Sequence, residues 1–336
     1  MPTPHQRPSI KDVAELAGVS WKTVTNVMHQ RPNVRPATRD RVLAAVQQLG
    51  YRPNRLARQL QEGRSRMLAL AIPDITSSYF GALAARIISL AGEDGWLVVI
   101  QETQGDPEIE EQVISGSDLY DADGLILVPT SLDPDRLHEA ASQQAIVAIG
   151  QREDPPGPNH VAIDNIASAR IATQHLLDRG RHRLAFLGGS DRGHGTGWLR
   201  QTGFLASLSA AGVEPVRLIE VDQYDRRSAA SAMSEALATG LPIDGVVCAV
   251  DALALGAMHA LRRAGLVVPD DVAVLGWDNI EDGEFANPTL TTVAPDVDAV
   301  ARAAVSGVLQ RIEQPVLDHL DTVHVPYRLI VRESTG

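Results

Sequence analysis

Residues Ile10–Val27 read IKDVAELAGVSWKTVTNV, and this stretch decides the fold of the N-terminal part of the chain. Its first half places apolar residues at steps of three and four before Gly18, as one buried face of a helix requires. Ser9 and Asp12 give the S-x-x-D pattern of a capping box, in which the serine side chain satisfies free N–H groups at a helix start. Gly18 stands where the chain leaves the helix in a left-handed conformation. The pattern predicts a helix that begins after Ser9 and ends before Gly18.

A second helix follows, with Ser20 as its predicted N-cap. Val24 and Val27 fall on its inner face, three residues apart. Together with Ala14 and Gly18, they supply a small contact position, a tight turn and two β-branched residues that pack the second helix against the first. This combination predicts a helix-turn-helix, and the alternative is an ordinary helical hairpin.

The outward face of the second helix carries side chains that can contact nucleic acid. Lys22 can donate to O6 and N7 of guanine, and Asn26 can pair with adenine through two hydrogen bonds. Trp21 and Thr25 can touch a thymine methyl group or a phosphate, and His29 falls on the same face. The alternative is a plain solvated face, on which an exposed tryptophan is uncommon.

A third helix is predicted over residues 36–49, with Gly50 at its C-terminal cap position. Its apolar residues recur at helical spacing, and the inward positions are Val42, Ala45, Val46 and Leu49. We place the helix-turn-helix head at residues 1–52.

A short basic segment separates this head from the rest of the chain, and we assign residues 53–66 to a hinge and linker. Asn54 can cap a helix of about two turns, which is too short to be stable alone in water. Arg55 contributes to the positive charge of the segment, and Leu56 and Leu60 are its apolar positions. We expect a hinge that folds only against DNA and a partner chain.

The charge of the chain divides near residue 66. Residues 1–66 contain twelve Lys and Arg against four Asp and Glu, a net charge of +8, whereas the whole chain carries −12. The remaining residues therefore carry −20, and both lysines lie in the head. A basic head on an acidic body is typical of a DNA-binding module joined to a domain that avoids DNA. The alternative is a basic solvated tail.

From Met67 onward, short apolar runs alternate with longer helical patterns. The predicted strands are Met67–Ile72, Leu97–Gln101, Gly124–Val128, Ala145–Ile149, Arg183–Leu187, Val216–Val221, Gly245–Ala249 and Val272–Gly276. The helical stretches include Tyr79–Glu93, Ile166–Arg179, Leu199–Ala211 and Ala252–Ala264. Alternation with continuous apolar strands predicts α/β architecture with parallel sheets covered on both faces. The strand–helix units are more numerous than a single sheet usually contains, so we expect two similar lobes over residues 67–336.

Composition argues against several other classes of protein. Hydrophobic residues make up 44% of the chain and charged residues 21%, which is normal for a globular protein with a sizeable core. An apolar run long enough to span a membrane is absent, and the N-terminus lacks the apolar region of a secretory signal. The single cysteine, Cys248, excludes an internal disulfide framework and fits a reducing compartment. We expect a cytoplasmic protein.

One glycine-rich run resembles the phosphate-binding loop of an enzyme. Residues 187–197 read LGGSDRGHGTG after a predicted strand, but they fit neither G-x-G-x-x-G nor the phosphate-binding loop that ends in Lys-Ser/Thr. The same run lacks the final glycine of a nucleophile elbow. The ten histidines show no metal-ligand spacing. We therefore predict that the chain is not an enzyme and needs neither a metal nor another cofactor.

The run Ile10–Gly63 resembles the head and hinge of the lactose-repressor (LacI/GalR) family of bacterial regulators. The matching strings are IKDVAELAGVSWKTVTNV, TRDRVLAAVQQLGYRPNRLARQL and, later, LGWDNIEDGE. The resemblance implies that operator DNA is read by Trp21, Lys22, Thr25 and Asn26. It also implies that Leu60 is the family's hinge leucine, which wedges into the minor groove, and that Ala57 is the small residue at which two hinge helices meet.

The resemblance covers essentially the whole chain and implies a periplasmic-binding-protein-like pair of lobes with a ligand in the cleft between them. Arg200, within an R-x-x-G-F match, is implied to bind hydroxyl or carboxylate oxygens of that ligand through its guanidinium fork. Asp278 is implied to accept a hydrogen bond from a ligand hydroxyl. Tyr79 and Phe80 fall at aromatic ligand positions, and their alternative is a place in the core.

Two further residues belong to this predicted effector site. Tyr224 matches another aromatic wall of the pocket, through a variable loop. Asp251 begins the helix after the Gly245–Ala249 strand, where it either caps the helix or contacts the ligand.

Four departures from the family pattern bear on specificity. Thr25-Asn26 replaces the usual Ser-Arg of the head, and Arg35 replaces a good capping residue before the third helix. Val250 stands where asparagine is common, and the run IGQR at residues 149–152 replaces Ile-Asp-Arg. Fewer hydroxyl partners leave a simple hexose, a sugar derivative and a less polar metabolite open as ligands.

The sequence as a whole predicts a DNA-binding transcriptional regulator, a repressor whose operator affinity a small carbohydrate-like effector controls. We expect a homodimer on a palindromic operator in double-stranded DNA, with no membrane partner. The alternative from a different class is a solute-binding protein of a transport system, which would share the two-lobed body but not the basic head.

Overall fold

In the computed structural model, the described residues are 8–28, 34–51, 64–116, 121–150, 160–189, 195–314 and 321–336. They fall into two compact units, Met1–Ser65 and Arg66–Gly336. Among the described residues, no helix is long and apolar enough to cross a membrane.

The described residues of the first unit form three helices around a small apolar core. These are α1 (Ile10–Ala17), α2 (Trp21–Met28) and α3 (Pro36–Leu49). The residues predicted to face inward meet in one cluster, in which Val13, Val24 and Val42 are completely buried. The predicted helix-turn-helix is therefore present, and its second helix packs on the first through Val24 and Val27.

Local signals define the ends of these helices as predicted. The Asp12 carboxylate accepts from the Ser9 N–H at 2.7 Å, which completes the capping box. Gly18 closes α1 with a φ of 62°. Arg35 precedes α3 and makes no side-chain capping bond, as its departure from a capping residue predicts.

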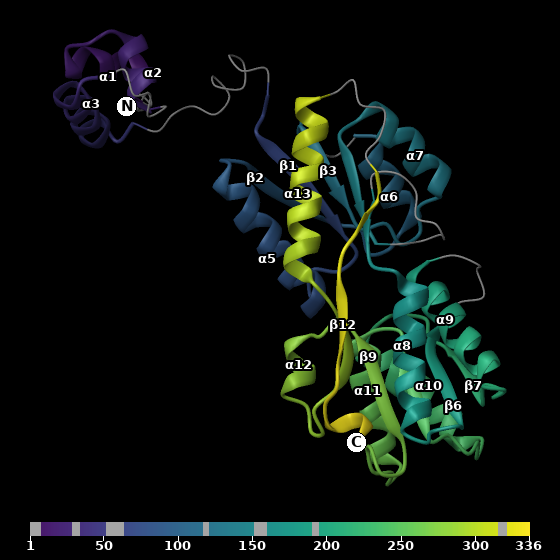
Figure 1. Ribbon diagram of the computed structural model, residues 1–336. Helices are drawn as coiled ribbons and strands as arrows, with labels where there is room; N and C mark the ends of the chain where they lie inside the picture. Colours follow the sequence, from purple (N-terminus) through teal and green to yellow (C-terminus); the bar gives the residue numbers. More distant parts are fainter. Residues whose placement is uncertain are drawn as a thin grey trace, which may run out of the picture. The chain divides into compact units, whose positions relative to one another are not determined.

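In the second unit, the described residues form two six-stranded sheets (Figure 1). The first has the order β11-β5-β4-β3-β1-β2, with bounds Val323–His324, His160–Ala162, Ile146–Ile149, Gly124–Leu127, Met67–Ile72 and Leu97–Glu102. The second has the order β12-β10-β9-β8-β6-β7, with bounds Tyr327–Ile330, Thr291–Pro295, Ala273–Trp277, Gly245–Cys248, Leu184–Gly189 and Arg217–Glu220. All described strand pairs are parallel except β10 with β12, which confirms the predicted doubly covered α/β lobes and adds one antiparallel edge.

Helices cover both faces of these sheets, and the side chains of β1, which point alternately to the two faces, illustrate this. Leu68, Leu70 and Ile72 point to one side, into the core that α5 (Ser78–Glu93) and α13 (Val297–Glu313) share. Ala69 and Ala71 point to the other side, with α6 (Pro107–Ile114) and α7 (Pro134–Gln143). Helices of the second lobe pack as two pairs, namely α8 (Asn165–Asp178) with α9 (Thr196–Ala210), and α10 (Arg226–Ala238) with α11 (Asp251–Arg263).

The chain passes between the lobes at more than one place. It leaves the first lobe after β5, returns after β10 to form α13, and leaves again between β11 and β12 (Figure 1). The short helix α12 (Glu281–Glu284) follows β9, and a 3-10 turn at Glu333–Thr335 ends the chain. Each of the eight predicted strands is a strand here, whereas β5, β10, β11 and β12 were not predicted from the sequence.

Candidate functional site

A cleft of about 1530 Å³ opens between the two lobes at the carboxyl ends of their parallel strands. The first lobe contributes the loops that follow β1, β2, β3 and β4. The second contributes the start of α9, the loop between β7 and α10, and the turn after β9. Carboxyl ends of parallel strands at a topological boundary are where α/β folds bind ligands.

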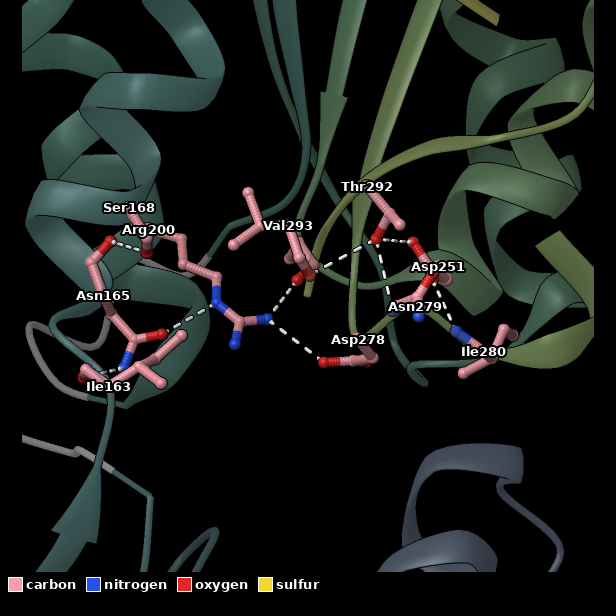
Figure 2. Close-up of polar contacts among 11 residues, drawn as sticks. Ile163, Asn165, Ser168, Arg200, Asp251, Asp278, Asn279, Ile280, Thr292 and Val293 are labelled. Carbon is pink, nitrogen blue, oxygen red and sulfur yellow. Dashed lines mark hydrogen bonds and ion pairs between the residues drawn. The ribbon is translucent and has the colours of Figure 1, made fainter. Parts of the chain in front are cut away.

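Arg200 occupies the floor of the cleft in the second lobe (Figure 2). It is 5% exposed, and its Nε donates to Asn165 Oδ1 at 2.9 Å while Nη1 donates to the carbonyl of Ala249. The guanidinium also stacks on the Trp277 ring, with 5.1 Å from Cζ to the ring centroid. These contacts hold the guanidinium in one orientation, which pre-organises its remaining donors.

Asp278 faces Arg200 across the floor, with 4.0 Å between its Oδ1 and Arg200 Nη1. Burial raises the pKa of Asp278 to about 6, although the nearby Arg200 lowers it. Burial conversely lowers the pKa of Arg200, which Asp278 opposes. A fixed donor and a fixed acceptor at this spacing can bind the hydroxyl groups of one ligand.

Aromatic side chains line the cleft from both lobes. Tyr79 and Phe80 lie at the start of α5 with ring centroids 5.4 Å apart and an edge-to-face angle of 68°. Burial raises the pKa of Tyr79, so its hydroxyl stays neutral. Tyr224 is 46% exposed on the opposite wall and donates to the carbonyl of Gly188, and Trp198 also lines the cleft. Trp198 was missed in the sequence because nothing in its helical context separates it from a core residue.

Asp251 lies behind the cleft rather than in its lining. Its side chain is completely buried, and its two oxygens accept from the Thr292 hydroxyl at 2.7 Å and from the Ile280 N–H at 3.0 Å (Figure 2). Burial and the nearby Asp278 raise its pKa well above the usual range. Val250, and not Asp251, holds the N-cap position of α11. Asp251 therefore does not cap α11, and its carboxylate is engaged inside the lobe.

Two departures from the family pattern do lie at the cleft surface. Val250 and Gly150 line it, at positions where the resemblance implies polar partners. Residues 151 and 152, the rest of that run, lie outside the described residues. The cleft wall also includes Thr130 and Ser131, whose backbone N–H groups donate to the buried Glu110 carboxylate at 2.9 and 3.0 Å. Glu110 was not predicted, because its partners are about twenty residues away in the sequence.

The residues of α2 that are predicted to read DNA are exposed or partly exposed. Trp21 is 45% exposed, Lys22 is exposed with its Nζ 5.8 Å from the Trp21 ring centroid, and Thr25 and Asn26 are partly exposed. Ser20 accepts from the Thr23 N–H at 3.2 Å and so caps the helix. The remaining predicted DNA contacts lie outside the described residues, namely His29, Asn54, Arg55, Ala57 and Leu60. Within the described residues, no group of three or more His, Cys, Asp or Glu could hold a metal ion.

Comparison with known proteins agrees with both parts of the chain. Residues 9–54 match the family of bacterial regulatory proteins called the lacI family, and residues 173–335 match the periplasmic binding protein-like domain. The chain is 31% identical to a ribose operon repressor of Halalkalibacterium halodurans over 97% of each chain. It is 32% identical to the transcriptional regulator GalS of Salmonella typhimurium over 90% of this chain and 89% of that one.

Solved structures give the same result. A lac repressor dimer bound to its operator aligns with a TM-score of 0.86 at 28% identity, over 98% of this chain and 99% of the other. A complex of the regulator CelR with cellobiose aligns with a TM-score of 0.68 at 29% identity, over 98% and 100%. The lacI-type head favours a regulator over the solute-binding protein, which would share only the body. The chain therefore belongs to the LacI family of bacterial regulatory proteins and is a DNA-binding transcriptional regulator.

Proposed function

We propose that this regulator is a homodimeric repressor whose affinity for a palindromic operator is set by a small carbohydrate-like effector in the interlobe cleft. The observation that carries the proposal is the Arg200–Asp278 pair on the cleft floor, in which Arg200 is buried, in a chain with a lacI-type head. Relatives are called ribose operon repressors, and CelR was solved with cellobiose. These names support a sugar or a sugar derivative as the effector.

The cleft has the chemistry that a polyhydroxylated ligand needs. The Arg200 fork can donate to two ligand oxygens, and Asp278 can accept from a hydroxyl. The rings of Tyr79, Phe80 and Tyr224 offer apolar surface to the C–H faces of a sugar ring. Apolar Val250 removes one possible hydroxyl partner, which favours a ligand with fewer polar groups on that side.

We assign residues 1–52 to the DNA-reading head, 53–66 to the hinge and linker, and 67–336 to effector binding and dimerisation. Each head would place α2 in a major groove, with Ser20, Trp21, Lys22, Thr25, Asn26 and His29 toward DNA. The hinge residues Asn54, Arg55, Ala57 and Leu60 would contact the operator centre. The lac repressor dimer on its operator supports this two-fold arrangement.

Ligand binding would act through the two lobes. A ligand that bridges them stabilises one relative arrangement, and that arrangement changes how the two heads of a dimer are spaced. The proposal contains no catalytic step, because a regulator needs only binding equilibria. A regulator of transcription acts where bacterial DNA lies, so we place the protein in the cytoplasm.

The first test is selection of genomic DNA fragments on the purified full-length protein without added effector, followed by sequencing. We expect enrichment of a palindrome, and its neighbouring genes then indicate the effector. The double variant Lys22→Ala, Asn26→Ala is the control, and it should lose the enrichment while the body stays folded. A wild-type protein that enriches no sequence, with or without added sugar, contradicts the proposal.

The effector is tested separately by calorimetry with D-ribose and D-cellobiose as probe sugars. Binding of either sugar with a change in operator affinity supports the proposal. If neither sugar binds, these two compounds are rejected as effectors. The sugar-utilisation genes next to the enriched operator fragments then indicate which sugar to test next.

A further inference from the structure

The turn between β9 and α12 brings two functional groups together at the cleft. At its start, the Asp278 carboxylate lies 4.0 Å from Arg200 on the cleft floor. Directly after it, in α12, Asp282 accepts from the hydroxyl of Ser78 at 2.8 Å, and Ser78 belongs to α5 of the other lobe. The Asp278–Asp282 turn, which includes the first residues of α12, therefore carries both a predicted ligand contact and a hydrogen bond that joins the lobes.

This turn adopts a backbone conformation that ordinary side chains disfavour. Asp278 has a φ of 102° and Asn279 a φ of 53°, and neither is glycine. Consecutive positive φ values in such residues cost free energy and persist only where surrounding contacts impose them. The contacts that impose them here lie beneath the turn, away from the cleft.

Two completely buried side chains supply those contacts (Figure 2). Asp251, at the start of α11, accepts from the Ile280 N–H at 3.0 Å and from the Thr292 hydroxyl at 2.7 Å. Thr292, on β10, in turn accepts from the Asn279 N–H at 3.2 Å. Two successive amides of the turn are thus held by one connected pair of side chains.

The neighbourhood of this pair is built around the buried carboxylate. A Cβ added to Gly276 would lie 2.2 Å from Asp251 Oδ1, so the glycine of β9 leaves the space that the carboxylate fills. Arg332 also holds this turn, with Nη2 donating to Asn279 Oδ1 at 2.8 Å. Neither Asp251 nor Thr292 lines the cleft. Their effect on a ligand must therefore pass through the turn.

We propose that Asp251 and Thr292 form a clamp that positions the Asp278–Asp282 turn, so that the ligand contact and the interlobe hydrogen bond move as one unit. Both are positioning residues and touch no ligand. The ligand part of this proposal rests on the proposed function, whereas the clamp itself is a property of the unliganded lobe. Ligand contact at Asp278 is in this way coupled directly to lobe closure at Asp282.

The clamp is tested by residue-resolved amide hydrogen exchange on the full-length protein without ligand. In Thr292→Val, which keeps the side-chain volume, we expect the Asn279 and Ile280 amides to exchange at least about tenfold faster. Thr292→Ser restores the hydroxyl and should restore slow exchange. Asp251→Ala should accelerate the same two amides, and Asp251→Asn should do so less, because its amide oxygen can still accept from Ile280.

Asp244→Ala is the matched control, because Asp244 flanks the other end of β8 as a buried carboxylate. Its carboxylate accepts from the Arg183 N–H at 2.9 Å and from Arg183 Nε at 3.1 Å, on the other side of the sequence from the turn residues. Its loss should lower the stability of the lobe without selective exchange at Asn279 and Ile280. The clamp is overturned if Thr292→Val leaves both amides as slow as in the wild type, or if Asp244→Ala accelerates them equally.

A second readout connects the clamp to binding. In Thr292→Val, we expect about tenfold weaker binding of whichever probe sugar, D-ribose or D-cellobiose, the wild type binds, with unchanged operator affinity in the absence of sugar. If Thr292→Val accelerates exchange of the Asn279 and Ile280 amides but leaves the sugar affinity unchanged, the proposed coupling between the clamp and ligand binding is overturned. A wild type that binds neither sugar counts against the proposed ligand, and the exchange pattern then decides on the clamp alone.

Discussion

At the scale of single residues, the cleft floor holds an acid whose ionisation opposes folding. The pKa of Asp278 is raised from 3.8 to about 6, chiefly by burial. Its contribution to stability is therefore complete below pH 4 and is lost as the pH rises through about 6, because the folded state then holds a buried charge.

Asp278→Asn removes this titration, so its stability relative to the wild type should rise with pH. Between pH 4 and pH 8 the difference in the free energy of unfolding should move in favour of the variant by about 2–3 kcal/mol, since one pKa unit corresponds to about 1.4 kcal/mol. Denaturant unfolding at several pH values measures it. A difference that stays constant over this range would mean that Asp278 titrates as an ordinary exposed acid.

Arg200 is the residue on which the proposed effector response depends. Arg200→Ala should weaken effector binding about 10–100-fold, because hydrogen bonds to a charged group contribute about 1.5–3 kcal/mol. Operator affinity without effector should remain, since Arg200 belongs to a different compact unit from the head. Calorimetry and operator-binding assays measure the two effects.

Two further variants sharpen the Arg200 test. Arg200→Lys keeps the positive charge but loses the fork that reaches Asn165 and Ala249, and it should also weaken binding. Arg170→Ala, at an exposed arginine of α8, should change neither effector nor operator binding. A full effector response in Arg200→Ala would remove this residue from the site.

The residue types at the site could be predicted from the sequence, but the role of Asp251 could not. Its position at a helix start indicates a cap or a ligand contact, and that inference uses only its neighbours in the chain. Its actual partners, Ile280 and Thr292, lie 29 and 41 residues away. Only the folded arrangement of β9, β10 and α11 brings them together.

At the scale of elements, the same distinction between local and distant interactions holds. The helices of the head follow from spacing within about twenty residues, so capping box, turn and inner face were all predictable. In the body, β10 and β12 were missed because neither is a continuous apolar run, and each becomes a strand by pairing within the sheet, β10 with both β9 and β12. The continuous apolar strands of the sheet centres, such as β1, β6 and β8, were found directly.

The turn of the helix-turn-helix offers a clean test of one element. Gly18 has a φ of 62°, and a Cβ there would meet no atom within 4 Å. Gly18→Ala should therefore destabilise the head by about 1 kcal/mol through backbone conformation alone. Gly18→Asn is the matched control with a smaller cost, because asparagine tolerates the left-handed region. Equal destabilisation by both variants, measured by thermal unfolding of the head, would assign the cost to packing instead.

At the scale of the whole molecule, the alternation of strands and helices predicted two lobes, but not how the chain passes between them. The return of the chain after β10 places α13 in the first lobe, against α5. Consequently each lobe contains segments that are far apart in the sequence, and a movement of one lobe is transmitted through several connections. The route of the chain between the lobes depends on which distant strands pair, and the periodicity of the sequence carries no information about that pairing.

The division of charge between head and body is the other property of the whole chain, and it predicts how operator binding responds to salt. Residues 1–66, the head and the hinge, carry +8 and the remaining residues −20, so favourable contacts with phosphates are confined to the head and the hinge. Operator affinity should fall at least about 10³-fold between 50 and 200 mM salt, as expected for six or more neutralised phosphates. Fluorescence anisotropy with a labelled operator gives the slope of log affinity against log salt.

Two variants test where the phosphate contacts lie. If Lys22 contacts a phosphate, Lys22→Ala should reduce the slope by about one per neutralised phosphate lost. If Lys22 reads a base, operator binding should weaken while the slope stays the same. Arg217→Ala, at an exposed arginine of β7, should leave the slope unchanged. A change of slope in Arg217→Ala would place part of the DNA interface on the body and contradict the division of charge as its physical basis.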